Sequence, residues 1–186
     1  MRECACRIKR EGISALQELY DLTAPRLYRY ALTITRHHQD AEDVLQAAMV
    51  RITLHSHRLA DAIHPWAYFL RVVRNEALRI AREQKARRSR EQLTSPEILE
   101  QGEMVTQDLQ GAGVSEIREF VQAAMKTLPA EQAEIVVLKI WEELTFAEIS
   151  QILDESPNTV ASRYRYALRK LNQSLEPIVG EALRNE

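Results

Sequence analysis

Residues 145–175 read TFAEISQILDESPNTVASRYRYALRKLNQSL, and this stretch decides how the C-terminal part of the chain is interpreted. Thr145 and Glu148 have the spacing of a capping box, in which each side chain bonds to the backbone of the other at a helix start. After a break in the apolar pattern, Ser156 is a good N-cap and Pro157 suits a first helical position. The stretch therefore predicts a short helix, a tight turn and a longer second helix.

The predicted second helix has an apolar face and a polar face. Its apolar residues recur at steps of three and four, and they are Val160, Tyr164, Ala167, Leu168, Leu171 and Leu175. The predicted outer stripe consists of Asn158, Ser162, Arg165, Tyr166 and Arg169, with Thr159, Arg163 and Lys170 beside it. This outer side has four basic residues and no acid. That pattern is typical of a helix placed in a DNA major groove, although a solvated helix of an ordinary bundle is the alternative.

The composition indicates an all-α protein with an uneven charge. The 186 residues include 45% hydrophobic and 28% charged residues and only five glycines, and the apolar residues recur mostly at helical spacing. The net charge is −2. Residues 71–90 nevertheless hold eight basic and two acidic residues, whereas residues 91–119 hold seven acids and one arginine. A basic functional face followed by an acidic connector is expected.

The N-terminal part predicts four helices. The first covers about residues 13–22, with Leu16, Leu19 and Tyr20 inward, and Pro25 is expected to start the second. Asp40 is expected to be the N-cap of a third helix over residues 41–56. A loop over residues 57–64 and a long helix from Pro65 follow. The segment before residue 13 is expected to be a polar tail.

The long helix that begins at Pro65 has an outer stripe suited to opened DNA. This stripe consists of Tyr68, Asn75, Arg79 and Arg82, at steps of seven, four and three. Aromatic rings stack on unpaired bases, amides and guanidinium groups read base edges, and cations hold phosphates. A basic amphipathic helix with a merely solvated face is the alternative.

The sequence predicts two small helical domains, over residues 13–90 and 116–179, joined by an acidic linker over residues 91–115. In the second domain, two helices are expected before the helix-turn-helix. The first is expected to bury Ile117, Phe120, Ala124 and Leu128, and the second, over residues 130–141, to bury Ile135, Leu138 and Trp141.

Several classes of function find no support in the sequence. Cys4 and Cys6 are two thiols without a second ligand pair, and the five histidines lack the spacing of a zinc hydrolase. No metal, cofactor or catalytic residue is therefore predicted, and no enzyme. Without an apolar run of 18 residues or a signal peptide, a cytoplasmic protein with no membrane insertion is expected.

Three segments, in order along the chain, resemble the extracytoplasmic-function (ECF) group of sigma-70 type RNA polymerase sigma factors. QDAEDVLQAAMVRI is similar to the helix by which this family binds polymerase, and YFLRVVRNEALRIAR to the helix that captures the melted −10 element. LPAEQAEIVVLKIWEELTFAEISQIL followed by NTVASRYRYALRKL is similar to the −35-binding domain. The resemblance covers about residues 13–175.

The resemblance implies a role for each surface. Glu42, Asp43 and Gln46 are expected to contact core RNA polymerase. The stripe from Tyr68 to Arg82 is expected to bind −10 bases. The second helix of the helix-turn-helix is expected to read −35 promoter DNA. An anti-sigma partner is also expected, and Ala161 and Tyr166 depart from the residues usual in the family.

Two other functions stay open at this level. A stand-alone helix-turn-helix regulator would share residues 145–175 but has no reason to carry the DAEDVLQ segment or the stripe from Tyr68 to Arg82. A helical protein that only mimics a sigma factor, and sequesters an anti-sigma partner, would not need its DNA-reading arginines.

Overall fold

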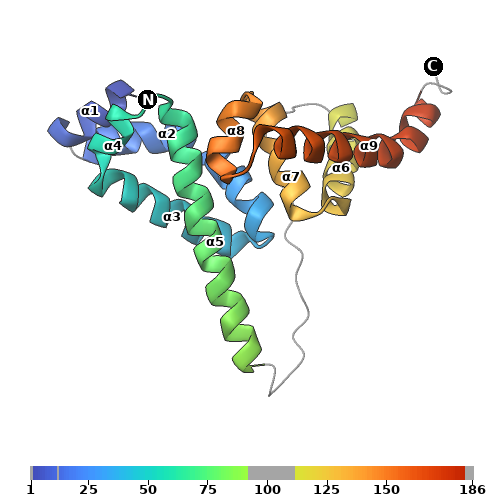
Figure 1. The fold of residues 1–186 in the computed structure, drawn as a ribbon, viewed down its shortest axis with the longest axis horizontal. Helices are drawn as coiled ribbons and strands as arrows, with labels where there is room; N and C mark the ends of the chain where they lie inside the picture. Colours follow the sequence, from blue (N-terminus) through green and yellow to red (C-terminus); the bar gives the residue numbers. More distant parts are fainter. Residues whose placement is uncertain (1, 12, 92–111, 183–186) are drawn as a thin grey trace. The chain divides into compact units, whose positions relative to one another are not determined.

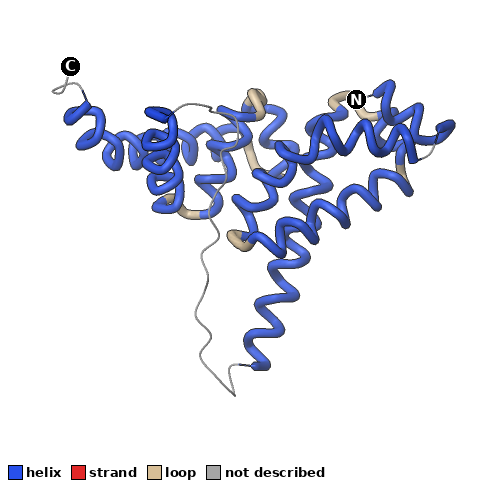
Figure 2. The backbone as a smooth tube through the Cα atoms, turned by 180° about the vertical axis from the view of Figure 1, so that it is seen from behind, coloured by secondary structure: helices blue, strands red, loops and turns tan. Residues whose placement is uncertain are grey.

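The computed structural model describes residues 2–11, 13–91 and 112–182, and these residues form helices joined by short turns (Figures 1 and 2). They contain no strand. The chain divides into two compact units, residues 1–103 and 104–186. The predicted all-α class with two helical domains is confirmed. Most of the predicted linker lies outside the described residues, so its extent stays a prediction.

The described residues of unit 1, 2–11 and 13–91, form five helices. They are α1 (Arg2–Glu11), α2 (Ile13–Thr35), α3 (His38–Leu54), α4 (Ser56–Asp61) and α5 (Pro65–Glu91). The helices α2, α3 and α5 pack on one another, and α1 lies against α2 and α4. The largest fully buried side chains of this unit are Leu19, Leu27, Tyr30, Ile52, Leu59, Phe69 and Leu70.

The predicted helix break at Pro25 is wrong, because α2 is one continuous helix with this proline inside it. A proline removes one backbone hydrogen bond, and a helix interior tolerates it only if other contacts compensate. Here Leu19, Thr23 and Leu27 are buried along one face of α2, and the Thr23 hydroxyl donates to the Leu19 carbonyl at 2.6 Å. Burial of this face on both sides of the proline keeps the helix continuous.

Two predicted irregular segments are helical. The expected polar tail forms α1, which buries Ile8, and the expected loop after α3 contains α4, which buries Leu59. Both helices are short and mostly polar. Each is stabilised by packing against the other. Tyr20, expected inward, is exposed because α2 packs through the neighbouring Leu19.

The start of α3 also differs from the prediction. His37, and not Asp40, is the N-cap, and its Nδ1 accepts a hydrogen bond from the Asp40 backbone N–H at 3.4 Å. Asp40 is instead buried in the first turn, where its carboxylate accepts a bond from Gln84 Nε2 of α5 at 3.2 Å. The Asp40 side chain, predicted to cap α3, thus bonds to α5 instead.

Unit 2 contains the predicted helix-turn-helix. Its elements are α6 (Ala112–Thr127), α7 (Ala130–Val136), the π-helical η1 (Val137–Trp141), α8 (Phe146–Leu153) and α9 (Pro157–Ala182). The helices α6, α7 and α8 all pack on α9. Met125, Leu128, Ile135, Leu138, Ile149, Val160 and Ala167 are buried between them.

Six apolar residues of unit 2 are less buried than predicted. Two are exposed and four are half-buried, and they are Phe120, Leu168, Trp141, Tyr164, Leu171 and Leu175. Phe120 is exposed, because α6 turns the face of Ala124, Met125 and Leu128 toward the core, and Ile117 lies outside the described side chains. Leu168 is 38% exposed because α9 packs through the face of Val160 and Ala167, which are fully buried. Trp141, at the end of η1, is half-buried.

The turn between α8 and α9 has the predicted end signals. Asp154 follows α8 in the left-handed conformation (φ 57°), which aspartate tolerates better than most residues, and its N–H donates to the Ser150 carbonyl. Ser156 Oγ accepts the backbone N–H of Thr159 at 3.1 Å, and α9 begins at Pro157. These contacts fix where the second helix starts.

Replacing Thr145 by alanine is expected to destabilise unit 2 by about 1 kcal/mol. The Thr145 hydroxyl accepts the Glu148 backbone N–H at 3.2 Å, and the Glu148 carboxylate accepts the Thr145 N–H at 2.8 Å. Urea unfolding should show the loss. Gln151→Ala, at an exposed position of the same helix, is the control and should change stability by less than about 0.5 kcal/mol. Equal effects of the two substitutions would contradict a capping role.

In the described parts of the chain, no helix combines the length and the apolar character that a membrane span requires.

Candidate nucleic-acid interface

The outer side of α9 presents the predicted reading residues. Asn158, Arg165, Tyr166 and Arg169 are exposed, and Thr159 and Ser162 are half-buried near the start of the helix. The Arg169 guanidinium lies over the Tyr166 ring, with 5.8 Å between its Cζ and the ring centroid. Contact with an aromatic ring restricts the orientation of an arginine side chain, and the charge of its guanidinium group stays available to a phosphate.

The hydroxyl groups of Ser162, in this stripe, and of Thr159, beside it, form hydrogen bonds with nearby residues. Ser162 Oγ donates to the Thr159 carbonyl at 2.9 Å, and Thr159 Oγ1 lies 2.8 Å from Ser156 Oγ. A hydroxyl that donates in this way retains its acceptor lone pairs. Asn158, next to this cluster, is exposed at the first turn of α9, where a recognition helix meets base edges.

Arg163 differs from the other basic residues of α9. Its side chain is 31% exposed, and its two terminal nitrogens face Glu131 of α7 at 3.5 Å and Glu155 of the turn at 3.1 Å. The guanidinium therefore joins α9 to α7 and to the turn before α9. Sequence spacing placed Arg163 beside the reading stripe, and the acids that hold it come from elements that spacing does not bring together.

The predicted stripe on α5 lies on the surface of unit 1. Asn75, Arg79 and Arg82 are exposed, and Tyr68 is half-buried. Arg79 Nε donates to Glu76 Oε2 at 2.9 Å, and its Nη1 donates to Glu83 Oε1 at 2.7 Å. The hydrogen bonds with Glu76 and Glu83 raise the pKa of the Arg79 guanidinium above its usual value.

Glu76 is a site residue that sequence reasoning missed. It is 3% exposed, yet its Oε1 lies 2.8 Å from Arg51 Nε of α3 and its Oε2 2.9 Å from Arg79 Nε. A signal for one of these contacts was present, because Glu76 and Arg79 are three residues apart on one helix. The contact with Arg51 depends on the packing of α3 against α5.

The predicted polymerase-binding residues lie on α3. Glu42, Asp43 and Gln46 are exposed. Close to them, Tyr28 Oη of α2 lies 2.6 Å from His38 Nδ1 of α3, and the two rings stack. Burial, together with the Glu42 carboxylate, raises the pKa of the Tyr28 phenol. The start of α3 is thus anchored on α2, while Glu42 and Asp43 face solvent.

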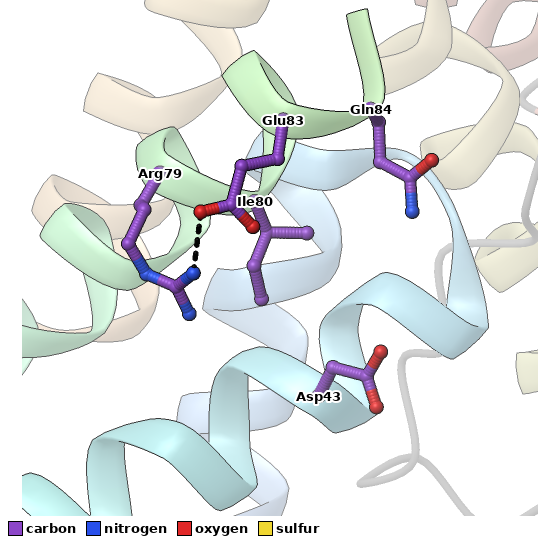
Figure 3. A pocket seen from close by; sticks show the side chains of 5 residues that line it. All are labelled: Asp43, Arg79, Ile80, Glu83 and Gln84. Carbon is purple, nitrogen blue, oxygen red and sulfur yellow. Dashed lines mark hydrogen bonds and ion pairs between the residues drawn. The ribbon is translucent and has the colours of Figure 1, made fainter. Parts of the chain in front are cut away.

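A depression of about 350 Å³ lies between α3 and α5 (Figure 3). The residues that line it are Asp43, Arg79, Ile80, Glu83 and Gln84. The packing of α3 on α5 thereby brings Asp43, predicted to contact polymerase, close to Arg79, predicted to bind DNA. Figure 3 shows Asp43 across the depression from the Arg79–Glu83 ion pair.

The described residues hold no cluster of three or more histidine, cysteine or acidic side chains that would suit a metal ion. Cys6 is exposed as a free thiol on α1, and the side chain of Cys4 lies outside the described residues.

Comparison with known proteins assigns a family to both units. The family described as Sigma-70 region 2 matches residues 19–87, and Sigma-70, region 4 matches residues 119–171. The RNA polymerase sigma-E factor of Streptomyces antibioticus is 30% identical over 143 residues, 74% of this chain and 71% of that protein. The ECF RNA polymerase sigma factor SigL of Mycobacterium tuberculosis is 29% identical over 164 residues, 88% of this chain and 90% of SigL. The chain belongs to the ECF group of the sigma-70 family.

A solved structure has the same fold as this sigma factor. The sigma factor RpoE of Bartonella quintana, in complex with the anti-sigma factor NepR, superposes with a TM-score of 0.70 at 20% identity and covers 88% of this chain and 98% of its own. The predicted polymerase and −10 residues fall within the region 2 match, and the predicted −35 residues within the region 4 match. A stand-alone helix-turn-helix regulator does not account for the region 2 match.

Proposed function

We propose that this ECF sigma factor binds core RNA polymerase and directs it to promoters through separate −35 and −10 contacts. One observation carries the proposal: α9 and α5, on different units of one chain, each present an exposed polar stripe within a sigma-70 region. The family acts in transcription initiation without being catalytic. We place this action in the cytoplasm, where the polymerase works.

The proposed roles follow the three surfaces. In α9, Asn158, Ser162 and Tyr166 read base edges of the −35 element, while Arg165 and Arg169 hold phosphates. In α5, Tyr68 stacks on an unpaired base of the melted −10 element, and Asn75, Arg79 and Arg82 contact the same strand. In α3, the polymerase surface consists of Glu42, Asp43 and Gln46. In this proposal α9 thus recognises duplex DNA, and α5 recognises single-stranded DNA.

Arg163 has a different proposed role in α9. Since its guanidinium faces Glu131 and Glu155, we assign it to holding α9 against the rest of unit 2. A phosphate would have to compete with two carboxylates for it. This assignment separates Arg163 from the exposed Arg165, two residues further along the helix.

We also propose an anti-sigma partner that holds this sigma factor inactive. The support is the fold shared with RpoE of Bartonella quintana, whose structure contains the anti-sigma factor NepR. Co-purification of the tagged full chain from its native cell, followed by mass spectrometry, tests this. A captured protein that blocks transcription by the reconstituted holoenzyme is the expected result.

Run-off transcription tests the main proposal. Core polymerase with the purified full chain should yield transcripts from a subset of a genomic promoter library, and core polymerase alone should not. Absence of any promoter-dependent transcript would refute the proposal. Specific binding of the isolated chain to duplex promoter DNA, without stimulation of transcription, would instead favour a stand-alone regulator.

Replacing Arg165 or Arg169 by alanine is expected to weaken binding to all promoters alike and to reduce the slope of log K against log salt by roughly one. For each phosphate contact that is lost, DNA binding releases about one counterion fewer. Holoenzyme binding to promoter DNA at several salt concentrations measures the slope. Lys126→Ala, at an exposed position of α6 outside the stripe, is the control and should leave the slope unchanged. A change confined to single promoter positions would contradict the phosphate role.

A further inference from the structure

Glu76 is a buried carboxylate of α5 that lies beside the exposed stripe residues Asn75 and Arg79. Its residue is 3% exposed, whereas Asn75 and Arg79 beside it are open to solvent. A carboxylate removed from water costs free energy unless cations and hydrogen bonds compensate. Both of its oxygens are compensated, since Oε1 faces Arg51 and Oε2 faces Arg79 at 2.8 and 2.9 Å. The buried carboxylate of Glu76 therefore restricts the positions of the Arg51 and Arg79 guanidinium groups.

Arg79 is held on two sides of its guanidinium group. The Nε–H points to Glu76 and one Nη1–H to Glu83. A guanidinium has five N–H donors in a rigid fork, so three remain, one on Nη1 and two on Nη2. Because two acids fix the plane of the fork, these remaining donors have a defined direction.

The charges within the chain of ion pairs that contains Arg79 cancel. Arg51 and Arg79 contribute two positive charges to this chain of ion pairs, and Glu76 and Glu83 contribute two negative charges. A neutral cluster attracts a phosphate weakly, because phosphate binding depends on net positive charge. Its directed N–H groups still suit the oxygen and nitrogen acceptors on a base edge. Arg82 is also exposed but forms no ion pair with another described residue, so its charge is available to a phosphate.

We propose that Glu76 is a positioning residue that makes Arg79 a base-reading donor rather than a phosphate anchor. The ligand is an unpaired base of the melted −10 strand that presents acceptor atoms toward α5. Arg51 of α3 completes the arrangement by occupying the second oxygen of Glu76. This inference rests on the proposed role of α5 in −10 recognition.

The test uses holoenzyme and promoters with a pre-melted −10 region, in which each −10 position carries each of the four bases. Arg79→Ala should reduce discrimination about tenfold at one position. Glu76→Gln, which keeps the shape but removes the charge, should reduce discrimination at the same position. In the Arg79→Ala background, Glu76→Gln should change discrimination less than twofold, because Glu76 acts through Arg79.

Two controls separate positioning from general effects. Arg82→Ala should weaken all templates alike and lower the salt slope by roughly one. Glu76→Gln should leave binding to core polymerase within about twofold of the parent. Equal weakening of all templates by Glu76→Gln, or multiplied effects of the two substitutions, would overturn the inference.

A second variant covers the case in which Glu76→Gln does not fold. Arg79→Lys keeps the positive charge but lacks the rigid fork, so discrimination should fall as in Arg79→Ala with an unchanged salt slope. Retained discrimination would overturn the inference. If Tyr68→Ala and Asn75→Ala still alter −10 discrimination, the proposed function of α5 survives that failure. If none of these substitutions has an effect, the proposed function fails as well.

Discussion

Phe69→Ala is expected to lower the free energy of unfolding of unit 1 by about 3–5 kcal/mol. The Phe69 side chain is fully buried at the start of α5 and meets Trp66 edge-on, with ring centroids 6.2 Å apart. Alanine would leave a cavity in the packing between α5 and its neighbours. Since the proposed −10 stripe is on α5, holoenzyme with this variant should also open promoters poorly at temperatures that the parent tolerates.

Urea unfolding, followed by circular dichroism, measures this loss. Leu54→Ala is the matched control, because Leu54 is also a large apolar residue of unit 1 but is 71% exposed. It should change the free energy of unfolding by less than about 0.5 kcal/mol. Similar losses for the two variants would show that burial of Phe69 is not what stabilises the unit.

Arg163→Glu is expected to destabilise unit 2 by roughly 1–3 kcal/mol and to weaken −35 recognition at least tenfold. The substitution removes two ion pairs and places a third carboxylate beside Glu131 and Glu155. The start of α9 would then lose a contact with α7 and with the turn. Thermal unfolding and holoenzyme binding to a −35 promoter measure the two effects.

A charge exchange decides between positioning and DNA contact. Glu155→Arg combined with Arg163→Glu restores an ion pair between the turn and α9, and the exposed Glu131 is free to move away. Most of the stability and of the −35 binding should return. If Arg163 instead contacts phosphate, the exchange should not restore DNA binding. Arg165→Glu is the control, because Arg165 is exposed and the exchange at residue 155 should not rescue it.

The helix-turn-helix was predictable because its signals are local. The capping box joins Thr145 to Glu148, and the N-cap Ser156 is followed directly by Pro157. Each signal spans no more than four residues, and the structure has each of them. The break expected at Pro25 was local too, but burial along α2 outweighed it. Local rules therefore held where no tertiary contact opposed them.

The site was partly predictable for the same reason. Exposure of Asn158, Arg165 and Tyr166 follows from helical spacing, and the structure has these side chains at the surface. The two acids that hold Arg79 lie three and four residues from it on α5, so helical spacing was a signal for both contacts. Spacing did not reveal the contacts of Arg163 with Glu131 and Glu155, because these acids lie outside α9.

By itself the sequence determined the helical class, the helix-turn-helix and the residues on its outer face, since all of these depend on periodicity and capping along one segment. Only the tertiary structure decided that Glu76 is buried between Arg51 and Arg79, and that Arg163 joins α9 to α7. Ion pairs between helices depend on which faces pack together. That packing depends on burial over the whole unit, which no single segment contains.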